Sequence, residues 1–340
     1  MLRLPCRMPR MRKFRFLTRF GAITMTLAVC AFVSRAQQPT SVTPNSMLDS
    51  FIRAKIAAWH TAGNTGDVYI YAKNLDTGTD YAFNADTPTP TASTIKLPVM
   101  IEAFYLAQDG KLDWKKKLTL ADNDKISGSG ILQDLSSGDQ LPGWDILRLM
   151  IELSDNSGTN LVLSQVDGNA VNARMASLGL QHTALMRGIL NNHTLPTGPA
   201  DNTGKPAPFG QTTEGAKPEN APFGIGRSCP RDMVILLEKL YRGQLVSKEA
   251  SDKMLDVMKH QFYHYAGRDL PDDVIASKSG GLDHFRSDVA LIYSPHGAIA
   301  MTITVNGIAK PNYSNSNPGA ALINDLSEIL RTGLATTSAK

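Results

Sequence analysis

The sequence predicts an α/β fold of the α+β type, in which both ends of the chain build one antiparallel sheet around an inserted helical lobe. Short segments of strand character lie near both ends of the chain, whereas the stretch between them is mostly apolar at helical spacing. A helical segment also flanks the strands at each end. With 340 residues, of which 42% are hydrophobic, the chain is long enough to bury a sizeable core.

The first predicted elements are a helix and a hairpin. Between Asn45 and Ala62 the apolar residues recur at helical spacing; they are Leu48, Phe51, Ile52, Ile56 and Trp59. Residues 68–72 then read as a strand, and residues 80–84 as its hairpin partner across the turn at 76–78.

The middle of the chain is predicted to be helical and the C-terminal part to return to strands. Further helices are expected at 144–153, 157–166, 231–240, 247–259 and 318–334, and further strands at 274–279, 287–294 and 298–306. Residues 188–226 form a long loop rich in Gly and Pro, and a loop of this length in a compact domain is usually functional or disordered.

The first 36 residues have the composition of a secretory signal peptide. Seven basic residues precede an apolar run over residues 21–33, which is too short to span a bilayer comfortably, and Ala36 provides a small residue for cleavage. We expect this signal to be removed, with residues 37–44 as a linker, so the mature protein would be periplasmic or secreted. A lipid anchor at Cys30 is not expected, because the bulky Val29 precedes it.

Removal of the signal changes the charge of the protein. Residues 1–36 hold eight of the 35 Lys and Arg and no acid, which leaves 27 basic against 31 acidic residues, a net charge of −4. This argues against nucleic-acid binding. Cys229 is the only cysteine outside the signal, so no intramolecular disulfide can form, and no membrane span is expected in the mature chain.

Ser93 and Lys96 form the first candidate catalytic pair. They lie three residues apart where a Pro/Thr-rich turn passes into an apolar helical run, and this spacing places both side chains on one helix face. A serine hydroxyl becomes a strong nucleophile only when a neighbouring base takes its proton. A lysine can serve as that base if burial or nearby positive charge lowers its pKa. Alone, the pair is more typical of a helix cap and a solvated surface charge.

Two further motifs follow in order: Ser154-Asp155-Asn156 and Lys278-Ser279-Gly280. The series S-x-x-K, S-D-N, K-[ST]-G is the signature of class A β-lactamases and penicillin-binding proteins. The chain therefore resembles the serine β-lactamase and penicillin-binding protein superfamily, most closely its class A-like branch. The Gly-Ser-Gly bend at 128–130 and the run from Ser154 to Leu161 are also similar to that branch.

The resemblance implies a domain layout and a cleft. The catalytic domain would cover residues 45–335, with 45–86 and 227–335 forming the α/β lobe and 87–226 the helical lobe, which includes the loop 188–226. The terminal helices would cover one sheet face. The cleft between the lobes would collect Ser93, Ser154 and Lys278.

The resemblance also implies roles in substrate binding. Lys278, Ser279 and Gly280 would lie on the strand edge of the cleft, where the ammonium and the hydroxyl suit a substrate carboxylate. Asn156 would hydrogen-bond the substrate's side-chain amide. Asp155 is expected to hold its loop in shape.

The chemistry implied is acyl transfer. Ser93 would attack the carbonyl with Lys96 as base, and Ser154 would relay a proton to the leaving nitrogen, helped by Lys278. The backbone N–H groups of Ser93 and Gly281 would form the oxyanion hole, at a typical worth of about 3 kcal/mol per donor.

The deacylation step lacks its usual residue. Class A β-lactamases use a loop glutamate in an E-x-x-L-N pattern, whereas residues 185–191 of this chain, where the pattern is expected, contain no acid. Glu214 and Glu219 lie in the long loop and could fold back. We therefore expect an acyl-enzyme that forms readily and hydrolyses slowly.

The sequence thus predicts an exported serine β-lactamase acting on β-lactam amide bonds, with antibiotic resistance as the associated process. The alternatives are a D,D-carboxypeptidase acting on D-alanyl-D-alanine-type cell-wall peptides and a covalent β-lactam sensor that does not hydrolyse. No cofactor is expected. His260, His264 and His284 are interpreted as solvated histidines rather than a zinc site, and a monomer suffices.

Overall fold

A computed structural model of the protein describes residues 46–190, 209–314 and 316–335. These residues belong to one compact unit, Val42–Lys340. The predicted signal peptide, the linker 37–44, Cys30 and residues 191–208 of the long loop lie outside the described residues.

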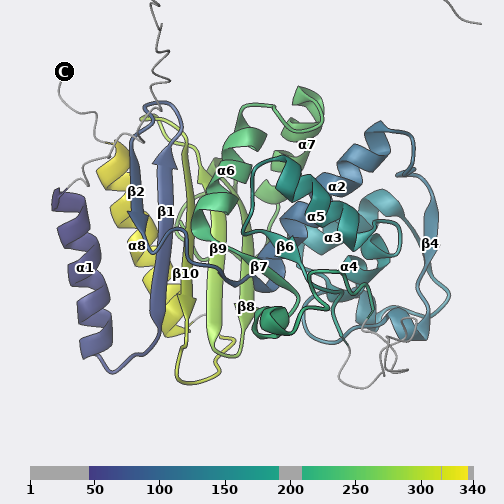
Figure 1. Ribbon diagram of the computed structural model, residues 1–340, viewed down its shortest axis with the longest axis horizontal. Helices are drawn as coiled ribbons and strands as arrows, with labels where there is room; N and C mark the ends of the chain where they lie inside the picture. The colour runs from purple at the N-terminus through teal and green to yellow at the C-terminus, as the bar shows by residue number, and fades with distance from the viewer. Residues whose placement is uncertain (1–45, 191–208, 315, 336–340) are drawn as a thin grey trace, which may run out of the picture. The chain divides into compact units, whose positions relative to one another are not determined.

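One five-stranded antiparallel sheet combines strands from both ends of the chain (Figure 1). Its order is β2 (Asp80–Phe83), β1 (Asp67–Asn74), β10 (Ile299–Asn306), β9 (Phe285–Ile292) and β8 (Ile275–Leu282). The N-terminal hairpin joins the C-terminal strands through the β1–β10 pair, in which Ile70 lies opposite Ile303. The predicted fold class is therefore confirmed.

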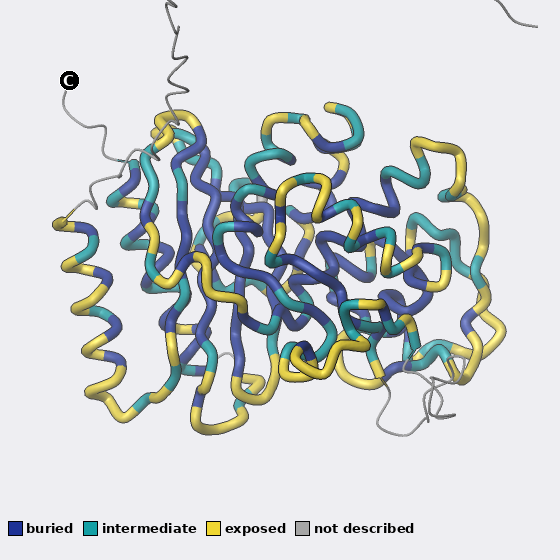
Figure 2. Tube along the Cα trace, viewed as in Figure 1, coloured by how far each residue is buried: buried dark blue, intermediate teal, exposed yellow. Residues whose placement is uncertain are grey.

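The two terminal helices cover one face of this sheet. Buried residues of α1 (Ser46–Thr61) and α8 (Pro318–Ala335) share one apolar cluster with strand residues such as Ile303. Ile52 and Leu330 are fully buried there, and burying such a side chain contributes roughly 1.5–3 kcal/mol. Figure 2 shows the alternation along α1, whose buried side faces the sheet while the other side is exposed.

The opposite face is continuous with the helical lobe. There α6 (Pro230–Tyr241) and α7 (Lys248–Lys259) contribute to a second apolar cluster that extends into α2 (Lys96–Gln108), α3 (Gly143–Glu152) and α4 (Asn156–Leu163). The lobe also contains α5 (Gly168–Ser177), which the sequence analysis did not predict. Arg174 of α5 donates from Nε to the buried carboxylate of Glu102 on α2 over 2.8 Å, and this contact ties the two helices together.

Short strands complete the described part of the lobe. A small sheet joins β3 (Thr89–Pro90), β7 (Gly226–Ser228) and β6 (Ala184–Leu185), and β4 (Lys117–Thr119) pairs with β5 (Gln140–Pro142). The described C-terminal part of the loop 188–226 contains a 3₁₀ helix over Pro218–Phe223. Segments of two or three residues are too short to show the alternation on which strand prediction depends.

Candidate active site

Ser93 lies at the point where the chain enters the helical lobe. It belongs to the 3₁₀ turn η1 (Ala92–Ile95), which passes directly into α2 at Lys96. Side chains three residues apart are eclipsed in a 3₁₀ turn, so Ser93 and Lys96 lie on the same side. Ser93 is half-buried, and its hydroxyl makes no hydrogen bond with any described residue. Ala92, just before it, has a φ of 47°, which is unusual for a residue with a Cβ.

Lys96 is fully buried and contacts the Ser-Asp-Asn segment. Its Nζ lies 2.7 Å from the carbonyl oxygen of Ser154, 3.3 Å from the Ser154 Oγ and 3.1 Å from Oδ1 of Asn156. Burial, followed by the positive charge of Lys278, holds the pKa of Lys96 well below the usual lysine value, whereas Asp155 acts in the opposite direction. A lysine with a lowered pKa can accept a proton near neutral pH.

The Ser-Asp-Asn segment is held by Asp155. This buried carboxylate caps α4 by accepting from the Gly158 N–H over 2.7 Å, and its other oxygen accepts from the N–H groups of Ile131 and Leu132 over 2.7 and 2.9 Å. Gly130 has a φ of 103°, and a Cβ there would lie 2.1 Å from Asp155 Oδ2. Only glycine fits this close approach, so the Gly-Ser-Gly bend and the motif are packed as one unit. These contacts agree with the structural role expected of Asp155.

Strand β8 lies against the η1 turn. A Cβ on Gly280 would lie 2.7 Å from the carbonyl oxygen of Thr91 and 3.2 Å from the backbone nitrogen of Ser93. The missing side chain therefore lets the strand backbone approach the candidate nucleophile. Gly281 is the next residue on β8. Its role beside Ser93 in an oxyanion hole stays a prediction.

Lys278 and Ser279 are both buried, and both contact the segment that follows α7. Lys278 donates from Nζ to Oε1 of Gln261 over 2.8 Å and to the Ser279 carbonyl over 3.0 Å. The Ser279 hydroxyl donates to the Tyr263 carbonyl over 2.6 Å. Burial lowers the pKa of Lys278 to about 7, although the negative charge of Asp288 acts to raise it.

The three motifs thus meet through direct contacts, close backbone approach and charge effects. Lys96 joins the Ser-Asp-Asn segment directly, Gly280 brings β8 to Ser93, and the charge of Lys278 reaches Lys96. The roles assigned to the individual residues remain predictions.

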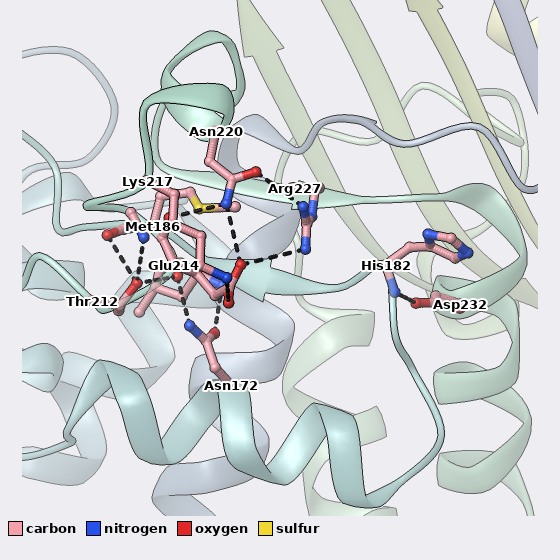
Figure 3. Close-up of polar contacts among 11 residues, drawn as sticks. Asn172, His182, Met186, Thr212, Glu214, Lys217, Asn220, Arg227 and Asp232 are labelled. Atoms are coloured by element: carbon pink, nitrogen blue, oxygen red, sulfur yellow. Dashed lines mark hydrogen bonds and ion pairs between the residues drawn. The ribbon is translucent and has the colours of Figure 1, made fainter.

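Glu214 is held in a polar cluster with residues of its own loop and of β7 (Figure 3). Its carboxylate lies 2.6 Å from Lys217 Nζ and 3.7 Å from Arg227 Nη2, and it accepts from Asn220 Nδ2 over 3.2 Å. The hydrogen bond from Lys217 is the main reason why its pKa is lowered. Glu219 is exposed. Among the described residues, neither carboxylate contacts Ser93 or Lys96.

The segment 185–191, where the loop glutamate of class A β-lactamases is expected, contains no carboxylate. Asn160 of α4 accepts from the Ile189 N–H over 2.9 Å and donates to the Ile189 carbonyl over 2.8 Å. Asn160 follows Asn156 by one helical turn, so both lie on the same face of α4. The loop is therefore fixed beside Asn156 by a residue without a carboxylate.

Comparison with known proteins gives the family. A family model described as "Beta-lactamase enzyme family" matches residues 51–333. The chain belongs to the β-lactamase enzyme family. The resemblance to the superfamily of serine β-lactamases and penicillin-binding proteins is confirmed, and the β-lactamase-family protein is a hydrolase of that kind. No curated protein matches the sequence significantly.

Solved structures with a similar fold cover most of the chain. A β-lactamase from Sphaerobacter thermophilus is 26% identical with a TM-score of 0.69, covering 85% of this chain and 99% of its own. PBP-A is 22% identical with a TM-score of 0.65, covering 86% and 97%. A class A β-lactamase from Mycobacterium abscessus is 17% identical with a TM-score of 0.67, covering 85% and 100%. A variant of PBP-A was solved as an acyl-enzyme complex with penicillin G.

The described residues of the β-lactamase-family protein contain neither a membrane-spanning helix nor a cluster of metal ligands. No helix there is long and apolar enough to cross a membrane. No group of three or more His, Cys, Asp and Glu side chains there could hold a metal ion.

Sequence reasoning missed Gln261. This residue is 4% exposed and contacts Lys278, but a single glutamine after a helix matches no motif. Only its burial, which the sequence does not show, distinguishes it from a surface residue.

Proposed function

We propose that this member of the β-lactamase enzyme family opens β-lactam amide bonds through an acyl-enzyme on Ser93 and releases the product slowly. The observation that supports this most strongly is the buried Lys96, whose Nζ lies within reach of the Ser154 hydroxyl while its pKa is held low. A neutral lysine beside a serine can act as the general base for nucleophilic attack.

In acylation, one proton passes from Ser93 to the leaving nitrogen through Lys96 and Ser154. Lys96 takes the proton of the Ser93 hydroxyl as Oγ forms a bond to the lactam carbonyl carbon. The tetrahedral intermediate collapses with cleavage of the C–N bond, and Ser154 delivers a proton to the leaving nitrogen. Ser154 in turn regains a proton from Lys96, whose Nζ lies 3.3 Å from its Oγ. The lactam ring is opened and the acyl group remains on Ser93.

Substrate recognition in this proposal falls to β8 and α4. The Lys278 ammonium would bind the substrate carboxylate, and the Ser279 hydroxyl would join it by turning its O–H away from the Tyr263 carbonyl. The Asn156 side chain would bind an amide. The Asn156 Oδ1 lies 3.1 Å from Lys96 Nζ and its Nδ2 donates to the Ser127 carbonyl over 3.0 Å. The amide nitrogen has a second N–H, which supports the proposed contact with substrate.

Slow release is expected because Ile189 has no carboxylate and the carboxylate of Glu214 is ion-paired. Hydrolysis of the ester requires a base that activates water, and neither position supplies one by its described contacts. The same observation favours a second candidate function, a D,D-carboxypeptidase acting on D-alanyl-D-alanine-type peptides. A cell-wall peptide provides the same carboxylate and amide to the same residues.

Time-resolved mass spectrometry distinguishes these functions. The mature protein is mixed briefly with benzylpenicillin, and the mass of the Ser93 adduct is followed after removal of free drug. Slow loss of the adduct that returns unmodified protein and hydrolysed penicillin supports the proposed function, whereas loss within seconds contradicts the slow release. An adduct that persists, together with D-alanine release from a diacyl peptide, supports the peptidase. Persistence without peptide turnover supports the covalent sensor. An adduct of equal yield in Ser93→Ala contradicts the proposal.

A further inference from the structure

Gln261 connects strand β8 with the end of α3. It lies two residues after the end of α7, and its side chain is buried. Its Oε1 accepts from Lys278 Nζ over 2.8 Å, and its Nε2 donates to the carbonyl oxygen of Glu152 over 3.3 Å. Glu152 is the last residue of α3 and lies two residues before Ser154. One amide therefore joins the strand lysine to the helix end that carries the Ser-Asp-Asn segment.

The segment that carries Gln261 is fixed along its length. The Phe262 N–H also donates to Glu152, over 2.9 Å, and the Tyr263 carbonyl accepts the Ser279 hydroxyl. Further along, Asp288 of β9 accepts from the Tyr265 and Ala266 N–H groups over 2.5 and 2.9 Å. Gln261 is therefore held by its backbone neighbours and has little freedom to move away from Lys278.

We propose that Gln261 is a positioning residue that holds the charged ammonium of Lys278 toward substrate. The proposal rests on the proposed acylation function. A lysine ammonium has three N–H donors. Gln261 and the Ser279 carbonyl accept from it, which leaves one N–H for a substrate carboxylate or for Ser154. The orientation of that N–H is set by the other two contacts.

The charges around Lys278 explain why a neutral acceptor matters there. Asp288 of β9 acts on Lys278 with its negative charge, and Lys278 in turn acts on Lys96, where Asp155 has the opposite effect. Asp288 is itself fully buried, and burial raises its pKa, while His264 acts to lower it. The ammonium is thus only marginally stable at neutral pH, so an acceptor dipole 2.8 Å away favours the charged form.

Two substitutions change this contact in opposite directions. Gln261→Leu removes the acceptor and should lower the pKa of Lys278, whereas Gln261→Glu adds a negative charge and should raise it. If acylation requires charged Lys278, the alkaline limb of the pH–rate profile moves with that pKa. We expect shifts of about one pH unit in each direction, and a roughly tenfold slower acylation of Gln261→Leu at about pH 8.

The measurements are the acylation rate constant with benzylpenicillin across the pH range and the NMR titration of the ¹³Cε signal of Lys278. Gln165→Glu is the matched control, because Gln165 Oε1 accepts from Lys116 Nζ over the same 2.8 Å at the surface. Its acylation profile should coincide with that of wild type. Merely structural damage would lower the rate without moving the alkaline limb.

The outcomes separate this inference from the proposed function. If wild type forms no Ser93 adduct, the proposed function fails, and the NMR titration alone decides whether Gln261 controls the Lys278 charge. If wild type is acylated but both variants keep the wild-type profile and titration, the inference is overturned. Should Gln261→Leu fail to fold, Gln261→Glu, which keeps a polar side chain of similar size, carries the test.

Discussion

The Nζ of Lys96 lies 3.3 Å from the Oγ of Ser154, and both side chains are buried where the helical lobe meets the sheet. Lys96 therefore contacts one serine hydroxyl directly, and the other serine of the proposed mechanism, Ser93, lies in the η1 turn three residues earlier.

Replacing Lys96 by Met should remove the base for acylation. We expect the acylation rate to fall about 10²- to 10⁴-fold, the usual worth of a general base. Lys96→Arg should be no better, because a guanidinium stays protonated. Stopped-flow with a chromogenic cephalosporin measures the rate, and Lys116→Met at the surface is the control. A wild-type rate in Lys96→Met would exclude Lys96 as the base.

A carboxylate placed at Ile189 should shorten the life of the acyl-enzyme. Asn160 fixes the Ile189 backbone through two hydrogen bonds and lies one turn from Asn156, which contacts Lys96. We expect Ile189→Glu to speed adduct loss at least about tenfold by activating water. Leu190→Glu, at the exposed neighbouring position, should not. Equal adduct lifetimes in wild type and Ile189→Glu would show that this loop does not face the ester.

Glu214→Gln should leave adduct loss unchanged, because that carboxylate is committed to Lys217 and Arg227. The ion pairs are partly exposed, so the free energy of unfolding should fall by no more than about 1 kcal/mol. Mass spectrometry of the adduct and urea denaturation measure the two effects. A tenfold longer adduct lifetime would instead identify Glu214 as the deacylating base.

Gly280→Ala should disturb the contact between β8 and the η1 turn. The new Cβ would lie 2.7 Å from the Thr91 carbonyl and 3.2 Å from the Ser93 nitrogen, both backbone atoms that cannot easily move. Overpacking of this kind typically costs about 1–3 kcal/mol, and we expect acylation to slow by at least about tenfold. Gly143→Ala is the control, because its Cβ would meet nothing closer than 3.7 Å. Unchanged acylation in Gly280→Ala would mean that β8 can move away from the η1 turn without affecting Ser93.

The burial of Lys278 should make stability depend on pH in a definite direction. Its pKa is about 7 in the folded protein against 10.5 ordinarily, so between these values the unfolded chain binds more protons. Stability of wild type relative to Lys278→Met should therefore rise with pH in this window, by up to about 1.4 kcal/mol per pH unit. Below pH 7 the difference should level off. Urea denaturation of both proteins at several pH values measures it, and a constant difference would contradict the lowered pKa.

The sequence predicted the main sheet, the terminal helices and the grouping of three motifs. Residues such as Ile299–Asn306 and the α1 stripe at Ile52 and Ile56 follow regular patterns, because one side of each element packs against the core. The motifs near Ser93, Ser154 and Lys278 were found by their order in the chain. The structure adds their contacts.

Other features depend on tertiary contacts that leave no mark in the sequence. Gln261 gains its place only because α7 ends beside α3 and β8. The ion pairs of Glu214 form only because β7 brings Arg227 next to its loop. In the sequence, both positions look like ordinary polar residues. Their partners belong to no motif that would link them.

The strained backbone angles at two residues of the candidate active site have an evolutionary consequence. Ala92 and Ser154 have φ values of 47° and 55°, and such conformations cost about 1–3 kcal/mol each in residues with a Cβ. Glycine at position 92 would relieve this strain, so lineages adapting to heat could reach higher melting temperatures by that single change. Ser154 offers no such route, because glycine there would discard the hydroxyl beside Lys96.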